Sequence, residues 1–383
     1  WVSTNLPTRA GIDAVTPDHP VFLYNSDPNT ALVNSKALAV AKITNAIIDL
    51  DAGAIERDAS GSPTGVLKGK AVELVRRFVP ADHERDWPAI IETATNYAVS
   101  LGVTSVQDTH SDDLFTTYLD LQRKGTLRTR VYDCVPPSNQ TAGTALKADS
   151  SAGDYARKGC VKTFSDGDDD WTAELKKIIS DAENAGQQIA VHAIGASANR
   201  AVADVLEKLM LSNGARDRRI RIEHAERADA ETISKFGRLK VIASVQPFLF
   251  ADSRPNGQYY KKILESGSLL ALGSDAPMTE LSPFRSIRAA VVNGGLTVEQ
   301  AVAAYTVGSA YAEFQETRKG KIAAGMLADI VILSQDIFSI APGNIAEAKV
   351  MTTIFDGKVI YDEKNLPANV SPPVSAGPRR SGN

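Results

Sequence analysis

The sequence predicts an α/β protein, a (β/α)8 TIM-like barrel followed by a small β-domain. Apolar or β-branched runs recur at intervals of roughly 20–30 residues, and helical patterns lie between most of them, as βα units require. Four of the runs lead to a Lys, His, His or Asp side chain. Because the C-terminal ends of parallel barrel strands meet at one mouth, this order is typical of a barrel that carries an active site there.

Seven strands are expected, and an eighth, the first of the barrel, would lie upstream of residue 103. The seven are 103–106, 129–132, the runs that end at Lys162, His192 and His224, 241–245, and 269–272. Helices are predicted over Trp87–Leu101, Ala173–Ala185, Ala198–Leu211 and Asp229–Phe236. The sequence has no GxGxxG or P-loop motif, so an open doubly wound sheet is disfavoured.

A β-domain is predicted after the barrel. Thr297–Ala312 has the pattern of an amphipathic helix, and 320–333 that of a turn leading into a buried strand. Residues 349–362 alternate around Asp356-Gly357, a strong indication of a hairpin. We therefore expect a barrel over 1–312, a small β-domain over 313–364, and a flexible tail rich in Pro, Ser and Gly over 365–383.

Composition restricts the partners. The net charge of −4 argues against nucleic acid or an anionic membrane, and no stretch approaches the ~20 apolar residues of a membrane span. A small-molecule substrate is the expected partner, and the oligomeric state stays open, with a homodimer among the options. The two cysteines, Cys134 and Cys160, predict no disulfide framework. We expect Cys160 to be a core thiol and the protein to be cytoplasmic.

Lys162, His192, His224 and Asp275 are the candidate metal ligands. Two imidazoles and a carboxylate suit zinc or a similar divalent ion, whereas an ammonium cannot ligate a metal. Lys162 joins the set only as a carbamate, formed when its deprotonated amine captures carbon dioxide. Each residue also has a simpler interpretation: a histidine bonded to backbone, a lysine with its head in solvent. Glu223, beside His224, is expected to be a structural carboxylate.

Several motifs, in this order and spacing, resemble the amidohydrolase superfamily, specifically its amidohydrolase-3, YtcJ-like branch. The matching text is Leu-Val-Asn-Ser-Lys at 32–36, Gly-Val-Thr-Ser-Val at 102–106, Val-Lys-Thr-Phe-Ser-Asp-Gly at 161–167, Val-His-Ala-Ile-Gly at 191–195, Arg-Ile-Glu-His-Ala at 221–225, Ser-Val-Gln-Pro at 244–247, Gly-Ser-Asp-Ala-Pro at 273–277 and Gly-Met-Leu-Ala-Asp at 325–329.

The resemblance implies a barrel with a composite β-sandwich built from both chain ends. It implies one or two divalent ions, with zinc as the first candidate. The ligands would be an HxH pair, carbamylated Lys162, His192, His224 and Asp275. Asp275 would act as general base on a metal-activated water, cleaving an amide-type C–N bond of a small molecule. His110, at the end of the predicted second strand, together with Asn29 and Arg221, are the candidate substrate-binding residues.

The sequence also departs from the family pattern. It contains no HxH, and the family's first strand and the N-terminal half of its sandwich are absent. Asn29 stands where relatives commonly have the histidine of Asp-Gly-His, Leu249 replaces a frequent histidine, and Ala196 replaces an aspartate. The chain starts at Trp1 with no initiator Met or signal-peptide pattern, and several joins look abrupt. We therefore expect further segments of the protein outside this sequence.

Two other functions compete with a hydrolase. A catalytically impaired relative could keep the barrel as a binding or assembly scaffold, which the missing HxH favours and the four intact ligand positions oppose. A metal-free lyase or aldolase with a Schiff-base Lys162 would need no histidine pair and predicts borohydride trapping. Metal content separates the hydrolase from the scaffold.

Overall fold

A computed structural model describes residues 7–25, 29–47, 53–80, 85–109, 114–137, 155–165, 171–214, 216–251 and 257–365. The chain divides into two compact units, one of described residues up to Asp86 and one that runs from Trp87 to Asn365. The predicted tail falls almost wholly outside the described residues. The predicted division at residue 312 lies inside the second unit and stays a prediction.

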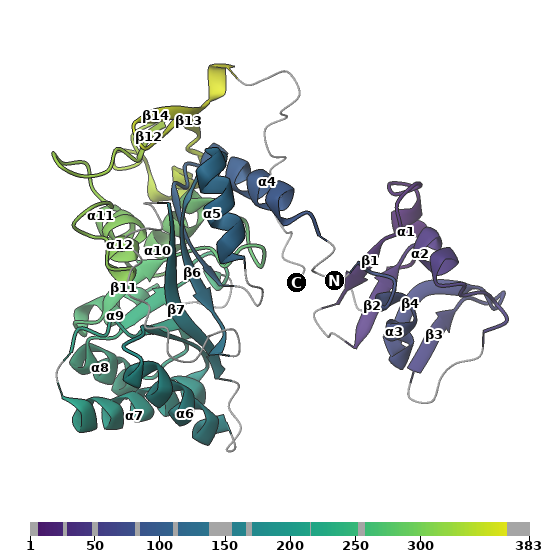
Figure 1. The fold of residues 1–383 in the computed structure, drawn as a ribbon, viewed down its shortest axis with the longest axis horizontal. Helices are drawn as coiled ribbons and strands as arrows, with labels where there is room; N and C mark the ends of the chain where they lie inside the picture. Colours follow the sequence, from purple (N-terminus) through teal and green to yellow (C-terminus); the bar gives the residue numbers. More distant parts are fainter. Residues whose placement is uncertain are drawn as a thin grey trace. The chain divides into compact units, whose positions relative to one another are not determined.

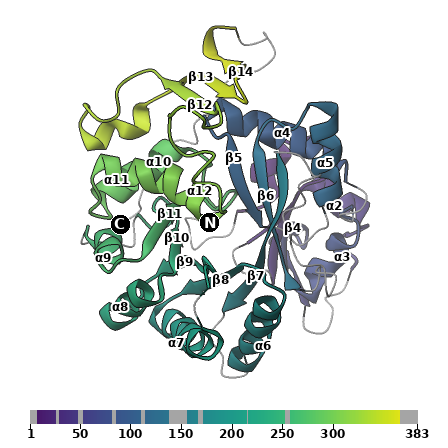
Figure 2. The same cartoon turned by 60° about the vertical axis from the view of Figure 1, so that its left-hand side comes forward.

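The second unit is built on a seven-stranded parallel sheet in the order β11-β10-β9-β8-β7-β6-β5. The sheet curls, and the helices lie along its outer side (Figures 1 and 2). All seven predicted strands are confirmed, as is the TIM-like fold. The strands are β5 Ser105–Thr109, β6 Arg130–Val135, β7 Ala156–Ser165, β8 Ile189–Ile194, β9 Arg221–Glu226, β10 Ile242–Val245 and β11 Leu269–Leu272.

The predicted helices are confirmed to within a few residues. Asp229 caps one of them by accepting from the Thr232 N–H, and Thr297 begins another through a capping box with Gln300. The helices are α4 Trp87–Ser100, α5 Phe115–Lys124, α6 Trp171–Asn184, α7 Ala196–Asn213, α8 Ala230–Leu239, α9 Tyr259–Glu265, α10 Pro283–Val292, α11 Val298–Ala303 and α12 Ser309–Ala312, with a π-helical turn, Ala304–Gly308, between the last two. None of the helices in the described part has the length and apolar character needed to cross a bilayer.

Alternation along the strands separates an apolar outer face from a polar inner one. Val191 and Ile222 are fully buried in the main apolar cluster, with side chains of α6, α7 and α8. Their neighbours His192 and Glu223 point to the other face, because successive strand residues face opposite ways. The core therefore lies between sheet and helices, and the barrel interior is left for polar chemistry.

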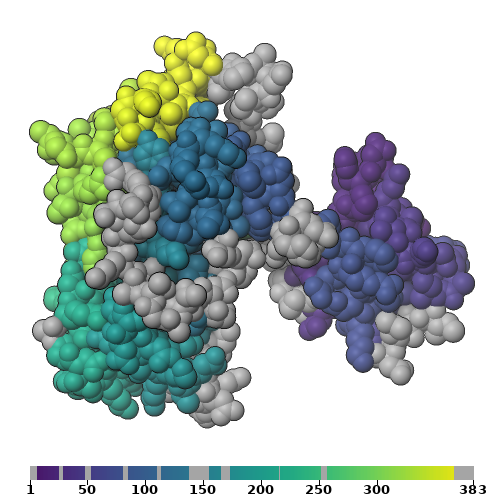
Figure 3. Space-filling model, viewed as in Figure 1, coloured from purple at the N-terminus to yellow at the C-terminus, as the bar shows by residue number. Residues whose placement is uncertain are grey.

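The small β-domain is a three-stranded antiparallel sheet in the order β12-β13-β14, and the predicted hairpin is confirmed. Asp356 and Gly357 both have positive φ, as a two-residue turn of this kind requires. The sheet packs on α4 (Figure 3). Thr353 Oγ1 donates to the Val99 carbonyl at 2.6 Å. Its elements are β12 Ile330–Leu333, β13 Val350–Phe355, β14 Lys358–Asp362 and the 3-10 turns Pro342–Glu347 and Glu363–Asn365.

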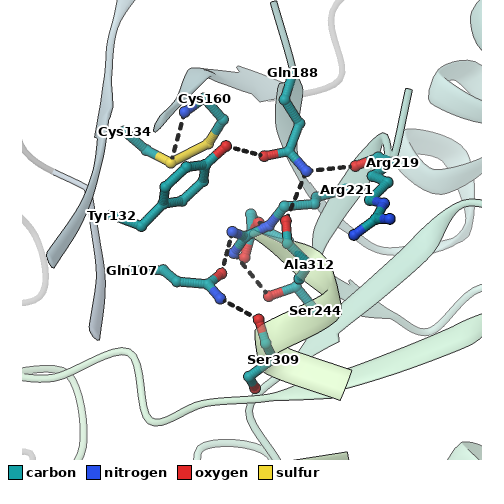
Figure 4. The surroundings of a disulfide bond; sticks show 11 residues. Gln107, Tyr132, Cys134, Cys160, Gln188, Arg219, Arg221, Ser244, Ser309 and Ala312 are labelled. Carbon is teal, nitrogen blue, oxygen red and sulfur yellow. Dashed lines mark hydrogen bonds and ion pairs between the residues drawn. A yellow bond between two sulfur atoms is a disulfide. The ribbon is translucent and has the colours of Figure 1, made fainter. Parts of the chain in front are cut away.

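The cysteine prediction is wrong in one respect. Cys160 is buried, as expected, but it is joined to Cys134 in a disulfide that links β7 to β6 (Figure 4). A separation of 26 residues in sequence becomes a Cα–Cα distance of 4.5 Å because the two strands are neighbours. The expectation of a cytoplasmic, reducing compartment loses the support it drew from unpaired cysteines.

The first unit has its own antiparallel sheet, in the order β1-β2-β4-β3, which the sequence analysis did not predict. Its apolar cluster includes Val33, Leu38, Leu67 and Val72. The elements are α1 Ala10–Asp13, β1 Phe22–Tyr24, β2 Thr30–Val33, α2 Ser35–Val40, β3 Gly53–Arg57, β4 Pro63–Gly69, the 3-10 turn Lys70–Val72 and α3 Glu73–Arg76.

Asn34 holds this unit together, and Asn34→Ala should destabilise it. The buried Oδ1 accepts from the N–H groups of Val21 (3.0 Å) and Ala37 (2.9 Å), and Nδ2 donates to the carbonyls of His19 (2.8 Å) and Thr16 (3.2 Å). Loss of a helix cap together with buried partners left unpaired should cost about 2–4 kcal/mol.

Hydrogen–deuterium exchange of peptides from residues 7–47 measures this local loss. The control is Asn45→Ala, an exposed asparagine with one long contact to Ser62 (3.4 Å). Equal protection in both variants would contradict the role given to Asn34.

Candidate metal centre

The register of three parallel strands brings the two candidate histidines together. Phe164 on β7 is paired with His192 on β8, and Ala193 with His224 on β9. The two imidazole rings lie in contact, with their centroids 4.5 Å apart and their planes at 74°. Two histidines 32 positions apart in sequence thus meet near the C-terminal ends of neighbouring strands.

His224 reaches this position through a break in strand alternation. Glu223 faces the interior, so its neighbour would by alternation face the helices. Instead His224 (φ 69°) and Ala225 (φ 50°) have left-handed backbones, and the β8–β9 register shifts beside them. Such conformations cost about 1–3 kcal/mol each and gather at functional sites. The bend turns the imidazole toward His192.

The His224 ring has the state that a metal ligand needs. Burial lowers its pKa, and the Lys162 charge adds to this, while Glu223 and Gln246 act in the opposite direction. The ring is therefore neutral near pH 7. Its Nδ1 is buried without a hydrogen-bond partner, and such a nitrogen, in the tautomer that leaves it unprotonated, is a good donor to a divalent ion.

Lys162 is buried, only 7% exposed, rather than an edge lysine with its head in solvent. Its Nζ lies 3.6 Å from the centroid of the Phe164 ring. The Lys162 charge acts on Glu223, His224 and Asp275, so it stands among the other candidate residues.

Asp275 follows β11 and also has a left-handed backbone, with φ 58°. Although the residue is open to solvent at its outer side, burial of the carboxyl raises its pKa; Glu223 raises it further, and Lys162 and His192 oppose this. The Asp275 carboxyl is thus within electrostatic range of Lys162, Glu223 and His192. A carboxylate with a raised pKa is suited to carrying a proton.

A metal at this point depends on Lys162. In the part of the chain that the structure describes, no group of three or more His, Cys, Asp and Glu side chains is arranged to hold a metal ion. His192, His224 and Asp275 are therefore not arranged as a three-ligand set in this structure, and Lys162 becomes a ligand only as a carbamate. The buried Nδ1 of His224, which has no hydrogen-bond partner, and the neighbouring His192 ring nevertheless offer nitrogen donors that suit a divalent ion.

Arg221, predicted to bind substrate, lies at the start of β9 and is engaged by the protein. Its Nε donates to Glu223 Oε1 at 2.7 Å, and its other nitrogens donate to Gln107 and, at 3.4 Å, to Ser244 (Figure 4). Gln107 in turn donates to the Ser309 carbonyl at 2.6 Å. These contacts support a structural role for Arg221 and Glu223, and substrate contact by Arg221 stays a prediction.

The structure does not test the other two predicted substrate residues. His110 lies outside the described residues. Asn29 belongs to the first unit, where it is exposed and its carbonyl accepts from Gly69 N–H at 2.8 Å. Their contact with substrate stays a prediction.

Gln246, whose side chain is hydrogen-bonded to His224, and the two aromatic rings that flank the histidines were not among the predicted site residues. Phe164 lies 5.4 Å from His192 and Phe250 lies 5.9 Å from His224, centroid to centroid. Strand alternation could have found Phe164, two residues beyond Lys162 and so on its face. Phe250 lies beyond the end of β10, where periodicity gives no guide.

A curled parallel sheet that carries histidines and a lysine toward its C-terminal edge is typical of the TIM-like hydrolase folds. The chain belongs to the amidohydrolase family, whose model matches residues 1–361. The resemblance to the YtcJ-like branch is thereby confirmed. Membership places this chain among hydrolases of carbon–nitrogen bonds.

Relatives match along most of the chain. Protein LONG AFTER FAR-RED 3 of Arabidopsis thaliana is 30% identical over 93% of this chain and 71% of its own length. A putative amidohydrolase YtcJ of Bacillus subtilis is 29% identical (93% and 77%), and an N-substituted formamide deformylase of Arthrobacter pascens is 27% identical (93% and 76%). Among solved structures, an uncharacterized metal-dependent hydrolase from Pyrococcus horikoshii matches with a TM-score of 0.66 and 25% identity, over 88% of this chain and 76% of that one.

Arg221 and Glu223 should behave as a buried ion pair in which each charge is stabilised by the other. Arg221→Met or Glu223→Leu alone leaves a buried charge unpaired and should cost about 3–5 kcal/mol, while the double variant should cost less than the sum. Urea unfolding measures these values. The control is Arg123→Met, because Arg123 pairs with Asp120 at the surface and should lose at most about 1 kcal/mol.

The pair also predicts a pH dependence. Burial raises the pKa of Glu223, but the Arg221 charge, Ser244 and Lys162 outweigh this and lower it. Its contribution to stability is then complete above the ordinary carboxyl pKa and is lost as the pH falls through the folded-state value. Additive single variants, or an acid-unfolding profile unchanged in Glu223→Gln, would contradict this assignment.

Proposed function

We propose that this protein is a metal-dependent amidohydrolase that cleaves an amide-type C–N bond of a small molecule. Lys162 as a carbamate, His192, His224 and Asp275 would hold one or two divalent ions, with zinc as the first candidate. The observation that carries the proposal is the contact between His192 and His224, in which His224 presents a neutral ring with a buried, unpartnered Nδ1.

The comparisons support the same chemistry. A similar solved structure is described as a metal-dependent hydrolase, and a relative is an N-substituted formamide deformylase. N-substituted formamides are therefore the first substrates to test. The left-handed backbones at His224 and Asp275 add support, because strain of this kind persists where function fixes a geometry.

In the proposed reaction, water adds across the C–N bond. A divalent ion, when bound, would lower the pKa of the attacking water and polarise the scissile carbonyl. Asp275 accepts the proton that the attacking water loses, while the hydroxyl bonds to the acyl carbon. Asp275 then returns a proton to the nitrogen as the C–N bond breaks, so the products are a carboxylate and an amine. Glu223, held by Arg221, keeps a negative charge below the site.

Metal content tests the ligand set. Wild-type protein purified without chelator, then given zinc and bicarbonate, should hold one or two zinc ions per chain by mass spectrometry, and Lys162→Ala should hold less. The control is Lys158→Ala, an exposed lysine on the same strand, which should match wild type. If the wild-type protein holds no metal after this treatment, the hydrolase proposal is rejected and the binding or assembly scaffold is favoured.

Asp275→Asn tests the proton carrier. The amide cannot accept the proton, so kcat for an N-substituted formamide should fall by about 10²–10⁴-fold. Asp181→Asn, at an exposed carboxylate on α6 that pairs with Lys177, should leave kcat unchanged. Steady-state assays of both variants at equal metal content measure these kcat values. A decrease in kcat of less than threefold in Asp275→Asn would show that Asp275 is not the proton carrier.

A further inference from the structure

We propose that Phe164, Ile194, Phe250 and Met278 form an apolar subsite that takes a hydrocarbon substituent, a ring or branched alkyl or aryl group, on the amide nitrogen of the substrate. We call these four residues the apolar border. The inference rests on the proposed function for the position of the scissile bond, and it goes further by naming the class of group beside that bond.

Strand periodicity places half of the border. Phe164 follows Lys162 by two residues on β7, and Ile194 follows His192 by two on β8. Residues two apart on a strand share a face, so each apolar side chain stands one step beyond a candidate ligand, toward the C-terminal edge. The 3.6 Å from Lys162 Nζ to the Phe164 ring confirms the shared face.

The aromatic rings form a continuous row. Phe164, His192, His224 and Phe250 follow one another with centroid distances of 5.4, 4.5 and 5.9 Å. A phenylalanine thus stands on each side of the histidine pair. Rings at these separations, in tilted or edge-on orientations, are in the usual range of aromatic contact.

The border keeps apolar surface open to solvent. Phe164 is 55% exposed, Met278 is 64% exposed, and Ile194 is 37% exposed. Met278 is fixed next to Asp275, since its N–H donates to the Asp275 carbonyl at 2.8 Å. Three of the four candidate ligands therefore have an exposed apolar side chain two or three residues further on. Exposed apolar surface gathered at a site marks a place where a ligand is bound.

The charges nearby do not favour a polar substituent. Leu249 stands where a histidine is frequent in relatives, and the Arg285 guanidinium is paired with Glu280 at 2.9 Å and lies over the Phe248 ring. Within the ranges that the structure describes, the polar residues assigned to the centre are those that the proposed hydrolysis employs. A hydrocarbon group on the nitrogen would cover the border, whereas a polar group would lose its water there.

Two pairs of near-isosteric probes test the subsite. The first pair is N-cyclohexylmethanesulfonamide and N-(oxan-4-yl)methanesulfonamide, which resist hydrolysis and differ by one methylene replaced by oxygen. Calorimetry on the full, metal-loaded chain should give a Kd roughly tenfold lower for the cyclohexyl compound. In Phe164→Ala and Phe250→Ala the preference should shrink by about 3- to 10-fold. The control is Phe338→Ala, at an equally exposed phenylalanine (52%) beyond β12.

The second pair carries the same substituents on formamides and reports hydrolysis. If neither formamide is hydrolysed, the proposed function is rejected. The subsite still stands in that case, provided that the cyclohexyl sulfonamide binds more tightly and that this preference depends on Phe164 and Phe250. Equal Kd values for the two sulfonamides, no binding of either, or a preference unchanged in the ring variants would overturn the subsite. Phe164→Leu, which keeps apolar volume, serves if Phe164→Ala does not fold, and should retain part of the preference.

Discussion

The parallel register of β7, β8 and β9 determines where the candidate site lies. Parallel pairing fixes which residues stand side by side, and a slip of one residue would exchange the inner and outer faces of a strand. With the observed register, Lys162 is level with Ala190 and His192 with Glu223, so the polar residues share the inner face. The apolar outer residues Val191 and Ile222 secure that register by packing against the helices.

A polar interior has consequences for stability. Below the histidines, the barrel contains Arg221, Glu223, Gln107 and Ser244 in place of the branched aliphatic layers usual in such barrels. Buried charges are tolerated only when they are paired and hydrogen-bonded, which these are. The network contributes little net free energy of folding by itself, but it fixes a negative charge beneath the site and holds three strands and α12 in one arrangement.

Function in this account depends on two departures from regular structure. The left-handed backbone at His224 overrides strand alternation and turns the ring toward His192. Asp275 shows the same conformation just after β11. Phe164 and Phe250 then flank the histidine pair, and apolar side chains around a small number of polar groups are the usual composition of a small-molecule site.

The sequence predicted the strands of the barrel because each is a short apolar run between helical patterns, and it predicted the hairpin from Asp356-Gly357. It did not predict the sheet of the first unit, whose strands are as short as Phe22–Tyr24 or as polar as Gly53–Arg57. The Cys134–Cys160 pair and the engagement of Arg221 depend on which strands are neighbours, and local pattern does not contain that information. Lys162 as a ligand came from family resemblance, since its chemistry alone favours solvent.

The most direct measurement is a crystal structure of the zinc-loaded protein, with anomalous scattering recorded on both sides of the zinc absorption edge. The account predicts a zinc peak about 2.0–2.1 Å from a ring nitrogen of both His192 and His224, with density for a carbamate on Lys162. A map with no zinc peak between the two histidines, from protein that has bound zinc in solution, would contradict it.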